Sequence, residues 1–123
     1  MLLQCLMVGI GGFLGAVSRF FVSSRVQAIS NSFFPLGTLA VNMLGCLLIG
    51  ILFGIVDSTQ LLGPYAENLL ITGFLGAFTT FSTFGYETLI LLRDRKIIQA
   101  FANIFMQIFV GILAVWLGYT IVT

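Results

Sequence analysis

Residues Thr72 to Phe84 read TGFLGAFTTFSTF. The stretch lies inside a long apolar run, yet two glycines and several hydroxyl side chains stand between its phenylalanines. Glycine weakens a helix, and hydroxyl groups compete for its backbone hydrogen bonds. Such backbone is tolerated at membrane depth only where protein or water supplies partners. The stretch therefore predicts a transmembrane helix that is broken near its middle, and it marks the expected functional centre.

The composition is that of a membrane protein. Of the 123 residues, 59% are hydrophobic and 7% are charged, whereas soluble domains carry about 25% charged residues. The chain has no His, two Cys and a formal net charge of +1. These counts exclude a His/Cys metal cluster, a Ser/His/Asp triad and a basic surface for nucleic acid. We therefore expect neither an enzyme nor a nucleic-acid-binding protein, and both thiols, Cys5 and Cys46, should be free because they lie at different depths.

Four apolar runs are long enough to cross a lipid bilayer. The transmembrane helices are expected at about residues 2–24, 35–56, 68–92 and 97–122. Short connections between them predict a single domain over residues 1–123. Gly11 and Gly15 in the first run, and Gly50 and Gly54 in the second, have the spacing that lets another backbone approach closely.

Polar side chains recur on single faces of these helices. Thr38 and Asn42 are four residues apart in the second run, as are Asn103 and Gln107 in the fourth. A carboxamide in mid-membrane is costly unless it hydrogen-bonds across helices or to a solute, and both roles are open to Asn42. Four helices of this length enclose little space. The polar faces therefore predict an oligomer whose subunits meet along them.

Charged residues stand near the ends of the runs. Arg19 either reaches the membrane interface or attracts anions into a vestibule. Glu87 lies one turn beyond Phe84, toward the basic residues 93–96, and is expected to be an interfacial carboxylate able to pair with one of those bases rather than a proton carrier. All five basic residues fall on the side of the first and third connections, so the positive-inside rule places both termini outside.

The groups around the predicted break are mainly hydrogen-bond donors without fixed positive charge. They comprise hydroxyls, the amides of Asn42 and Gln107, and backbone N–H groups freed by the break. Such donors suit a small anion that must exchange its hydration for direct hydrogen bonds and still leave. Phe81 and Phe84 share a helix face, where they either pack or turn positive ring edges toward an anion. Freed carbonyls could instead hold a cation.

Several segments together resemble the Fluc/CrcB family of fluoride channels. These segments are Gly37-Thr38-Leu39, Asn42-Met43-Leu44-Gly45, Gly73-Phe74-Leu75-Gly76, Thr79 to Phe84, and Glu87-Thr88. The similarity covers essentially the whole chain, and the threonine–phenylalanine stretch is a specific signature. It implies a multi-pass protein of a bacterial cell membrane that exports cytoplasmic fluoride by passive, electrogenic flow. Two pores would lie at the interface of an antiparallel dimer, and the activity would lower fluoride toxicity.

The resemblance also implies roles for individual residues. Backbone carbonyls of Gly76 and Thr79 from both subunits would hold a structural Na+ at the dimer centre. Arg19 and Glu87 would lie toward a vestibule. The candidate residues of the fluoride pathway are Thr38, Asn42, Thr80, Phe81, Ser82, Thr83, Phe84, Asn103 and Gln107.

Two features depart from the family pattern. The fourth helix of the family carries hydroxyls along its polar face, whereas this chain has Asn103, Gln107 and Gly111. The one-sided basic residues also suit a homodimer of opposite orientations poorly. We expect an antiparallel homodimer, with a heterodimer of oppositely oriented paralogues as the alternative.

Two other functions compete with a fluoride channel. One is a small multidrug-resistance-type proton-coupled exporter, which needs a carboxylate deep in the first helix that this chain lacks. The other is a structural membrane subunit whose polar faces serve only packing.

Overall fold

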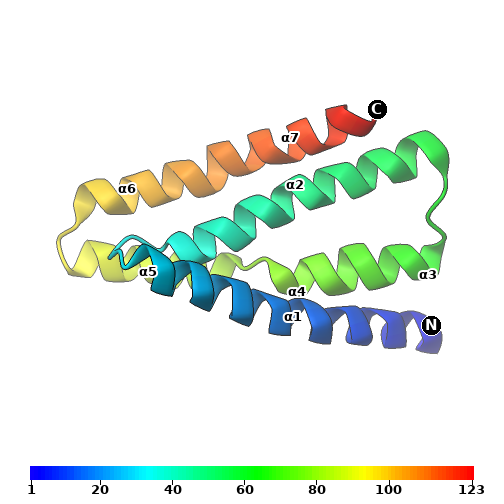
Figure 1. Cartoon of the computed structure of the whole chain (residues 1–123), viewed down its shortest axis with the longest axis horizontal. Coiled ribbons are helices and arrows are strands. Elements are labelled where there is room, and N and C mark those ends of the chain that lie inside the picture. The colour runs from blue at the N-terminus through cyan, green and yellow to red at the C-terminus, as the bar shows by residue number, and fades with distance from the viewer.

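The computed structural model describes residues 1–123 and is entirely helical. Four helical spans are long and apolar enough to cross a membrane: Leu2–Ser30, Leu36–Thr59, Pro64–Arg93 and Ile97–Val122. Successive spans run in opposite directions, so both termini lie at the same end of the bundle (Figure 1). The predicted all-α fold with four membrane spans is confirmed.

The third and fourth spans are each divided into shorter elements. The elements in chain order are α1 (Leu2–Ser30), α2 (Leu36–Thr59), α3 (Pro64–Glu67), η1 (Asn68–Leu75), α4 (Gly76–Phe78), α5 (Phe81–Arg93), α6 (Ile97–Phe105), η2 (Met106–Val110) and α7 (Gly111–Val122). The elements η1 and η2 are π-helical. The third span leaves the helical conformation at Thr79 (φ −93°, ψ 159°) and Thr80 (φ −152°, ψ 120°). The third helix is therefore broken near its middle, where the sequence predicts the break.

The first helix continues to Ser30, beyond its predicted end near residue 24. The side chain of Gln27 accounts for the extension, because it pairs with the connection that follows. Its amide nitrogen donates to the carbonyls of Ser32 and Phe34, and its oxygen accepts from the N–H of Gly37. Residues 25–30, which lie outside the helix ranges predicted from the sequence, thus belong to α1.

The second and third helices also differ from their predicted ranges. α2 ends at Thr59 instead of residue 56, and Gln60 closes it in a left-handed conformation with φ 51°. The third span begins at Pro64 instead of residue 68. Proline suits the first turn of a helix, because its fixed φ is helical and that turn leaves N–H groups unpaired in any case.

Glycines bring two pairs of helices into backbone contact. A Cβ atom added at Gly11 or Gly15 of α1 would overlap backbone atoms of η1. A Cβ atom at Gly50 or Gly54 of α2 would likewise meet backbone atoms of α7. In Figure 1, α1 accordingly lies along the first half of the third span, and α2 lies along α7. The small-residue spacing serves packing inside one subunit.

The buried core is small and lies beside the break. Val41, Leu75 and Phe78 form it, on α2, η1 and α4. Most large apolar side chains of α1 and α7 are exposed instead. This distribution suits helices that face lipid.

We expect Gly15→Ala to lower the melting temperature of the detergent-solubilised protein, measured by circular dichroism. The added methyl group would overlap the Phe74 backbone and separate α1 from the third span. Gly9→Ala is the matched control on the same helix, because nothing lies within 4 Å of a Cβ atom there. The control should be neutral or stabilising, since alanine exceeds glycine in helix stability by about 0.5–1 kcal/mol. Equal melting temperatures for the two variants would contradict the close packing of α1.

Candidate functional site

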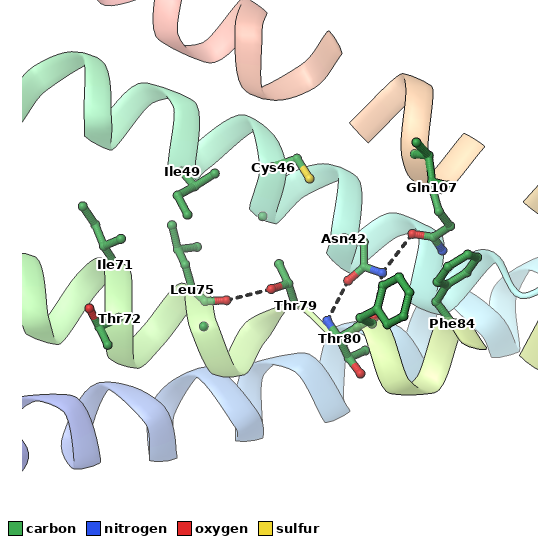
Figure 2. Close-up of a pocket in the computed structure, with 14 residues that line it drawn as sticks. Asn42, Cys46, Ile49, Ile71, Thr72, Leu75, Thr79, Thr80, Phe84 and Gln107 are labelled. Carbon is green, nitrogen blue, oxygen red and sulfur yellow. Dashed lines mark hydrogen bonds between the residues drawn. The ribbon is translucent and has the colours of Figure 1, made fainter. Parts of the chain in front are cut away.

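A cavity of about 340 Å³ lies beside the break in the third helix (Figure 2). Its walls come from α2, η1, α4, α5 and η2, together with the two extended residues of the break. Its polar lining residues include Asn42, Thr80 and Gln107, and its aromatic ones are Phe81 and Phe84. The structure thus gathers five of the candidate pathway residues around one space.

Asn42 compensates for the break in the backbone. In a continuous helix the N–H of Thr80 would donate to the carbonyl of Gly76, four residues earlier. It donates instead to Oδ1 of Asn42 at 2.8 Å, while Nδ2 of Asn42 donates to the carbonyl of Thr80 at 3.0 Å. One buried side chain therefore partners both backbone groups of Thr80. Of the two roles open to Asn42 on sequence grounds, the interhelical one is present in the structure.

The same amide joins a third helix to the break. Nδ2 of Asn42 also donates to Oε1 of Gln107 in η2, at 2.9 Å (Figure 2). The network therefore connects α2, the start of α5 and the middle of the fourth span. Gln107 contacts Asn42 while Asn103, four residues earlier, points to a different partner on α5.

Hydroxyl side chains at the break form hydrogen bonds at the N-terminus of α5. Thr80 is the N-cap, and its Oγ1 accepts from the N–H of Thr83 at 3.2 Å. It also hydrogen-bonds the hydroxyls of Thr83 at 3.1 Å and Ser82 at 3.2 Å. Threonine is favoured at an N-cap because its oxygen pairs with an N–H that no helical carbonyl reaches. The hydroxyl of Thr79, in contrast, donates back to the carbonyl of Leu75 at 3.0 Å.

Phe81 and Phe84 stand edge to face in the first turn of α5. Their ring centroids are 5.3 Å apart, and their planes make an angle of 70°. Phe84 is buried, whereas Phe81 is 79% exposed in the single chain. An aromatic edge carries partial positive charge, so the pair can turn such an edge toward a negative ion. Phe81 needs lipid or a second subunit to cover it.

A second polar cluster lies further along α5. The hydroxyl of Thr38 donates to Oε1 of Glu87 at 2.8 Å, and Nδ2 of Asn103 donates to Oγ1 of Thr88 at 3.0 Å. Asn103 is fully buried. Thr88 is not among the candidate pathway residues, although Glu87-Thr88 is one of the segments that carry the resemblance; its hydroxyl donates to the carbonyl of Phe84 at 2.8 Å.

Glu87 has no basic partner. The ion pair of the third connection joins Arg93 to the neighbouring Asp94 at 3.2 Å, and both are exposed. The expected pairing of Glu87 with the bases of residues 93–96 is therefore absent, because its carboxylate turns toward Thr38 on α2. The partner of the Glu87 carboxylate is thus the Thr38 hydroxyl instead of a basic side chain.

Arg19 lines a separate cavity of about 230 Å³ with Thr38, Thr80 and Thr83. The residue is half-buried on α1. A fixed positive charge thus adjoins the wall formed by the hydroxyl residues of α5. This position suits the vestibule role that the resemblance implies.

The backbone before the break fits a cation held by neutral oxygens. The Gly76 carbonyl lacks the N–H of Thr80, which donates to Asn42. Gly76 is exposed in the single chain, and Thr79 is extended. No group of three acidic, His or Cys side chains gathers anywhere in the chain. Freed carbonyls of an unwound membrane helix are ligands that suit Na+.

Comparison with known proteins identifies the family of this chain. The model of the CrcB-like family (camphor resistance, CrcB) matches residues 6–119. The chain belongs to the CrcB-like family. The resemblance read from the sequence is confirmed, and this CrcB-like chain, with its four apolar spans, is a multi-pass membrane protein with bacterial relatives.

Three relatives cover most of this CrcB-like chain, and each is named a fluoride-specific ion channel FluC. The relative from a Nitratiruptor species is 49% identical over 105 residues, which is 85% of this chain and 80% of the relative. The relative from Campylobacter lari is 45% identical over 116 residues, 94% of each chain. The relative from Campylobacter jejuni is 45% identical over 125 residues, 98% of each chain.

Asn42→Leu should destabilise this CrcB-like protein, because it leaves the N–H and the carbonyl of Thr80 without partners. Each buried polar group left unpaired costs about 1–3 kcal/mol. Asn68→Leu is the control, since Asn68 is a half-buried asparagine of the third span, located before the break. Thermal unfolding in detergent measures both variants. A melting temperature for Asn42→Leu equal to that of the control would show that Asn42 does not support the break.

Proposed function

We propose that this chain is a fluoride-specific ion channel, which lets cytoplasmic fluoride leave the cell by passive, electrogenic flow and so lowers its toxicity. The observation that carries the proposal is the cavity at the break, where amide and hydroxyl residues meet two phenylalanines. The proposal is supported by relatives at 45–49% identity that bear the name of fluoride-specific ion channels.

The cavity suits a small anion that must pass through. No carboxylate and no basic side chain is among its lining residues. Neutral donors replace the hydration of an anion without holding it as tightly as a fixed positive charge would. The edges of Phe81 and Phe84 offer further partial positive charge. Fluoride, small and strongly hydrated, gains more from such close donors than the larger chloride.

A single chain leaves the site incomplete. Phe81 and Gly76 are exposed beside the break, although each belongs to a candidate site. A second subunit packed on this face would cover both. We therefore propose an antiparallel homodimer with two fluoride pores along its interface. The carbonyls of Gly76 and Thr79 from both subunits would hold a structural Na+, which would offset the carbonyl dipoles that meet at the dimer centre.

The structure supports neither the proton-coupled exporter nor the purely structural subunit. A proton-coupled exporter of the multidrug-resistance type needs an acid within its first helix, and α1 contains no Asp or Glu. A purely structural subunit has no need for a cavity beside a broken helix. The channel accounts for both the cavity and the break.

In liposomes loaded with fluoride, we expect rapid electrogenic release of fluoride with chloride nearly excluded, followed with a fluoride electrode. Phe81→Ile should abolish this flux and leave the fold intact, because Phe81 is 79% exposed in the single chain. Phe101→Ile is the matched control: Phe101 is 64% exposed on α6 and does not line the cavity. It should conduct as the unsubstituted protein does.

Three results would contradict the proposed channel or its pathway. If the folded, unsubstituted protein releases no more fluoride than empty vesicles do, the channel function is wrong. Normal flux through Phe81→Ile would instead place the pathway elsewhere. A requirement for a pH gradient would favour the proton-coupled exporter.

The antiparallel homodimer requires chains of both orientations in one membrane. Both termini lie at one end of the bundle, and the connection from α5 to α6 lies at the other (Figure 1); this connection contains Arg95 and Lys96. We expect a C-terminal tag to be accessible to protease from each side of the membrane in comparable amounts. A single uniform orientation would indicate a heterodimer with an oppositely oriented paralogue.

A further inference from the structure

We propose that one end of the bundle carries a binding site for the phosphate group of an anionic phospholipid, built around Lys96 and Phe33. This basic end is the one at which α1 and α5 stop and α2 and α6 start (Figure 1). The site would bind lipid and not fluoride, so its existence does not depend on the channel function.

The two ends of the bundle differ in charge. Arg25 and the bases of residues 93–96, four of the five basic side chains, lie at the basic end. The connection from α2 to α3 at the opposite end has no Lys or Arg, and Asp57 and Glu67 flank it. Anionic headgroups are attracted by clustered bases and repelled by acids. The basic end is therefore the one that suits an anionic lipid.

Lys96 keeps its positive charge available to a ligand. The only ion pair of the chain joins Arg93 to Asp94. Nζ of Lys96 lies instead 3.7 Å from the centroid of the Phe33 ring. A cation over an aromatic face retains its charge and its N–H donors, so it can bind an anion at the same time. The contact also joins the α1–α2 connection to the α5–α6 connection, which are far apart in the sequence.

A surface cavity of about 440 Å³ opens beside this pair. Its lining residues are Gln27, Ala28, Asn31, Ser32 and Phe33. Phe33 thus forms one wall of the cavity and holds Lys96 next to it. The hydroxyl of Ser32 accepts from the N–H of Phe34 at 3.1 Å and keeps its own hydrogen for an anion. The cavity therefore combines a hydrogen-bond donor with an adjacent positive charge.

Two further positive groups flank the cavity. Arg25 is exposed, and it lies three residues before Ala28, so both are on the same side of α1. Cζ of Arg25 is 5.3 Å from the centroid of the Phe21 ring. α6 begins directly after Lys96, and no side chain caps its N-terminus. The N–H groups of that first turn add partial positive charge beside the lysine.

A lipid suits this position better than a free phosphate ion. All four membrane-spanning helices begin or end here, so the basic end lies at the depth of the headgroups. Phe20 and Ile29 on α1 and Ile98 on α6 are exposed, and they can contact acyl chains. A free phosphate ion gains nothing from apolar side chains. An anionic phospholipid matches both the charged and the apolar parts of the surface.

Lipid titration of the detergent-solubilised protein tests for the site. The melting temperature is measured with increasing phosphatidylglycerol and with phosphatidylcholine of the same acyl chains. We expect phosphatidylglycerol to raise the melting temperature until the site is saturated, because a ligand of the native state stabilises it. Phosphatidylcholine and inorganic phosphate should have little effect. An equal rise with phosphatidylcholine or with inorganic phosphate, or no rise with phosphatidylglycerol, would overturn the proposal.

Lys96→Gln and its matched control Arg93→Gln distinguish a site from general attraction between charges. Each variant removes one positive charge from the same end, but the charge of Arg93 is already paired with Asp94. We expect the apparent affinity for phosphatidylglycerol to fall about fivefold in Lys96→Gln, the effect of one base near an anionic surface. In Arg93→Gln it should fall less than about twofold. Equal affinities in the two variants would overturn the proposal.

Native mass spectrometry gives a second readout, which does not depend on how Lys96→Gln changes the melting temperature. It counts the phosphatidylglycerol molecules that stay bound after the detergent is removed. We expect the unsubstituted protein and Arg93→Gln to retain phosphatidylglycerol and Lys96→Gln to retain less. Equal retention by all three proteins would contradict a site at Lys96.

Discussion

The pair of hydrogen bonds between the Asn42 amide and the Thr80 backbone is the interaction on which the rest of the site depends. Lipid offers no hydrogen-bond partners, so a helix can stop at membrane depth only where another part of the protein supplies them. Asn42 supplies both at one residue. The break in turn lets α5 start anew with Thr80 as its cap, and it leaves the Gly76 carbonyl without its usual donor.

Close helix packing at glycines places Asn42 beside the break. Gly45 lies three residues after Asn42 on α2, and a Cβ atom there would overlap the side chain of Thr79. α2 can therefore approach the extended residues closely enough for a short asparagine to reach both backbone groups. Gly15 on α1 contributes in the same way, since it admits the backbone of η1 just before the break. The polar network is thus placed by residues that have no polar side chains.

Local sequence signals predict most of this architecture. Apolar length predicts the four spans, and glycines with hydroxyls predict a break within residues 72–84, which the structure places at Thr79 and Thr80. What the sequence does not predict depends on partners distant in the chain. The extra turn of α1 depends on Gln27 pairing with the following connection, and Glu87 turns to Thr38 although bases lie nearer in sequence. Nothing local marks the π-helical turn at Gln107, or the hydrogen bond that joins Gln107 to Asn42 on a distant helix.

The exchange of the Thr80 amide hydrogen with deuterium tests the central interaction most directly, because that hydrogen is bonded to a side chain rather than to a helical carbonyl. NMR of the protein in detergent would follow it in the unsubstituted protein and in Asn42→Leu. We expect slow exchange in the unsubstituted protein and exchange at least about tenfold faster in the variant, with amides in the middle of α5 unchanged. Equal exchange rates at Thr80 in the two proteins would contradict this expectation.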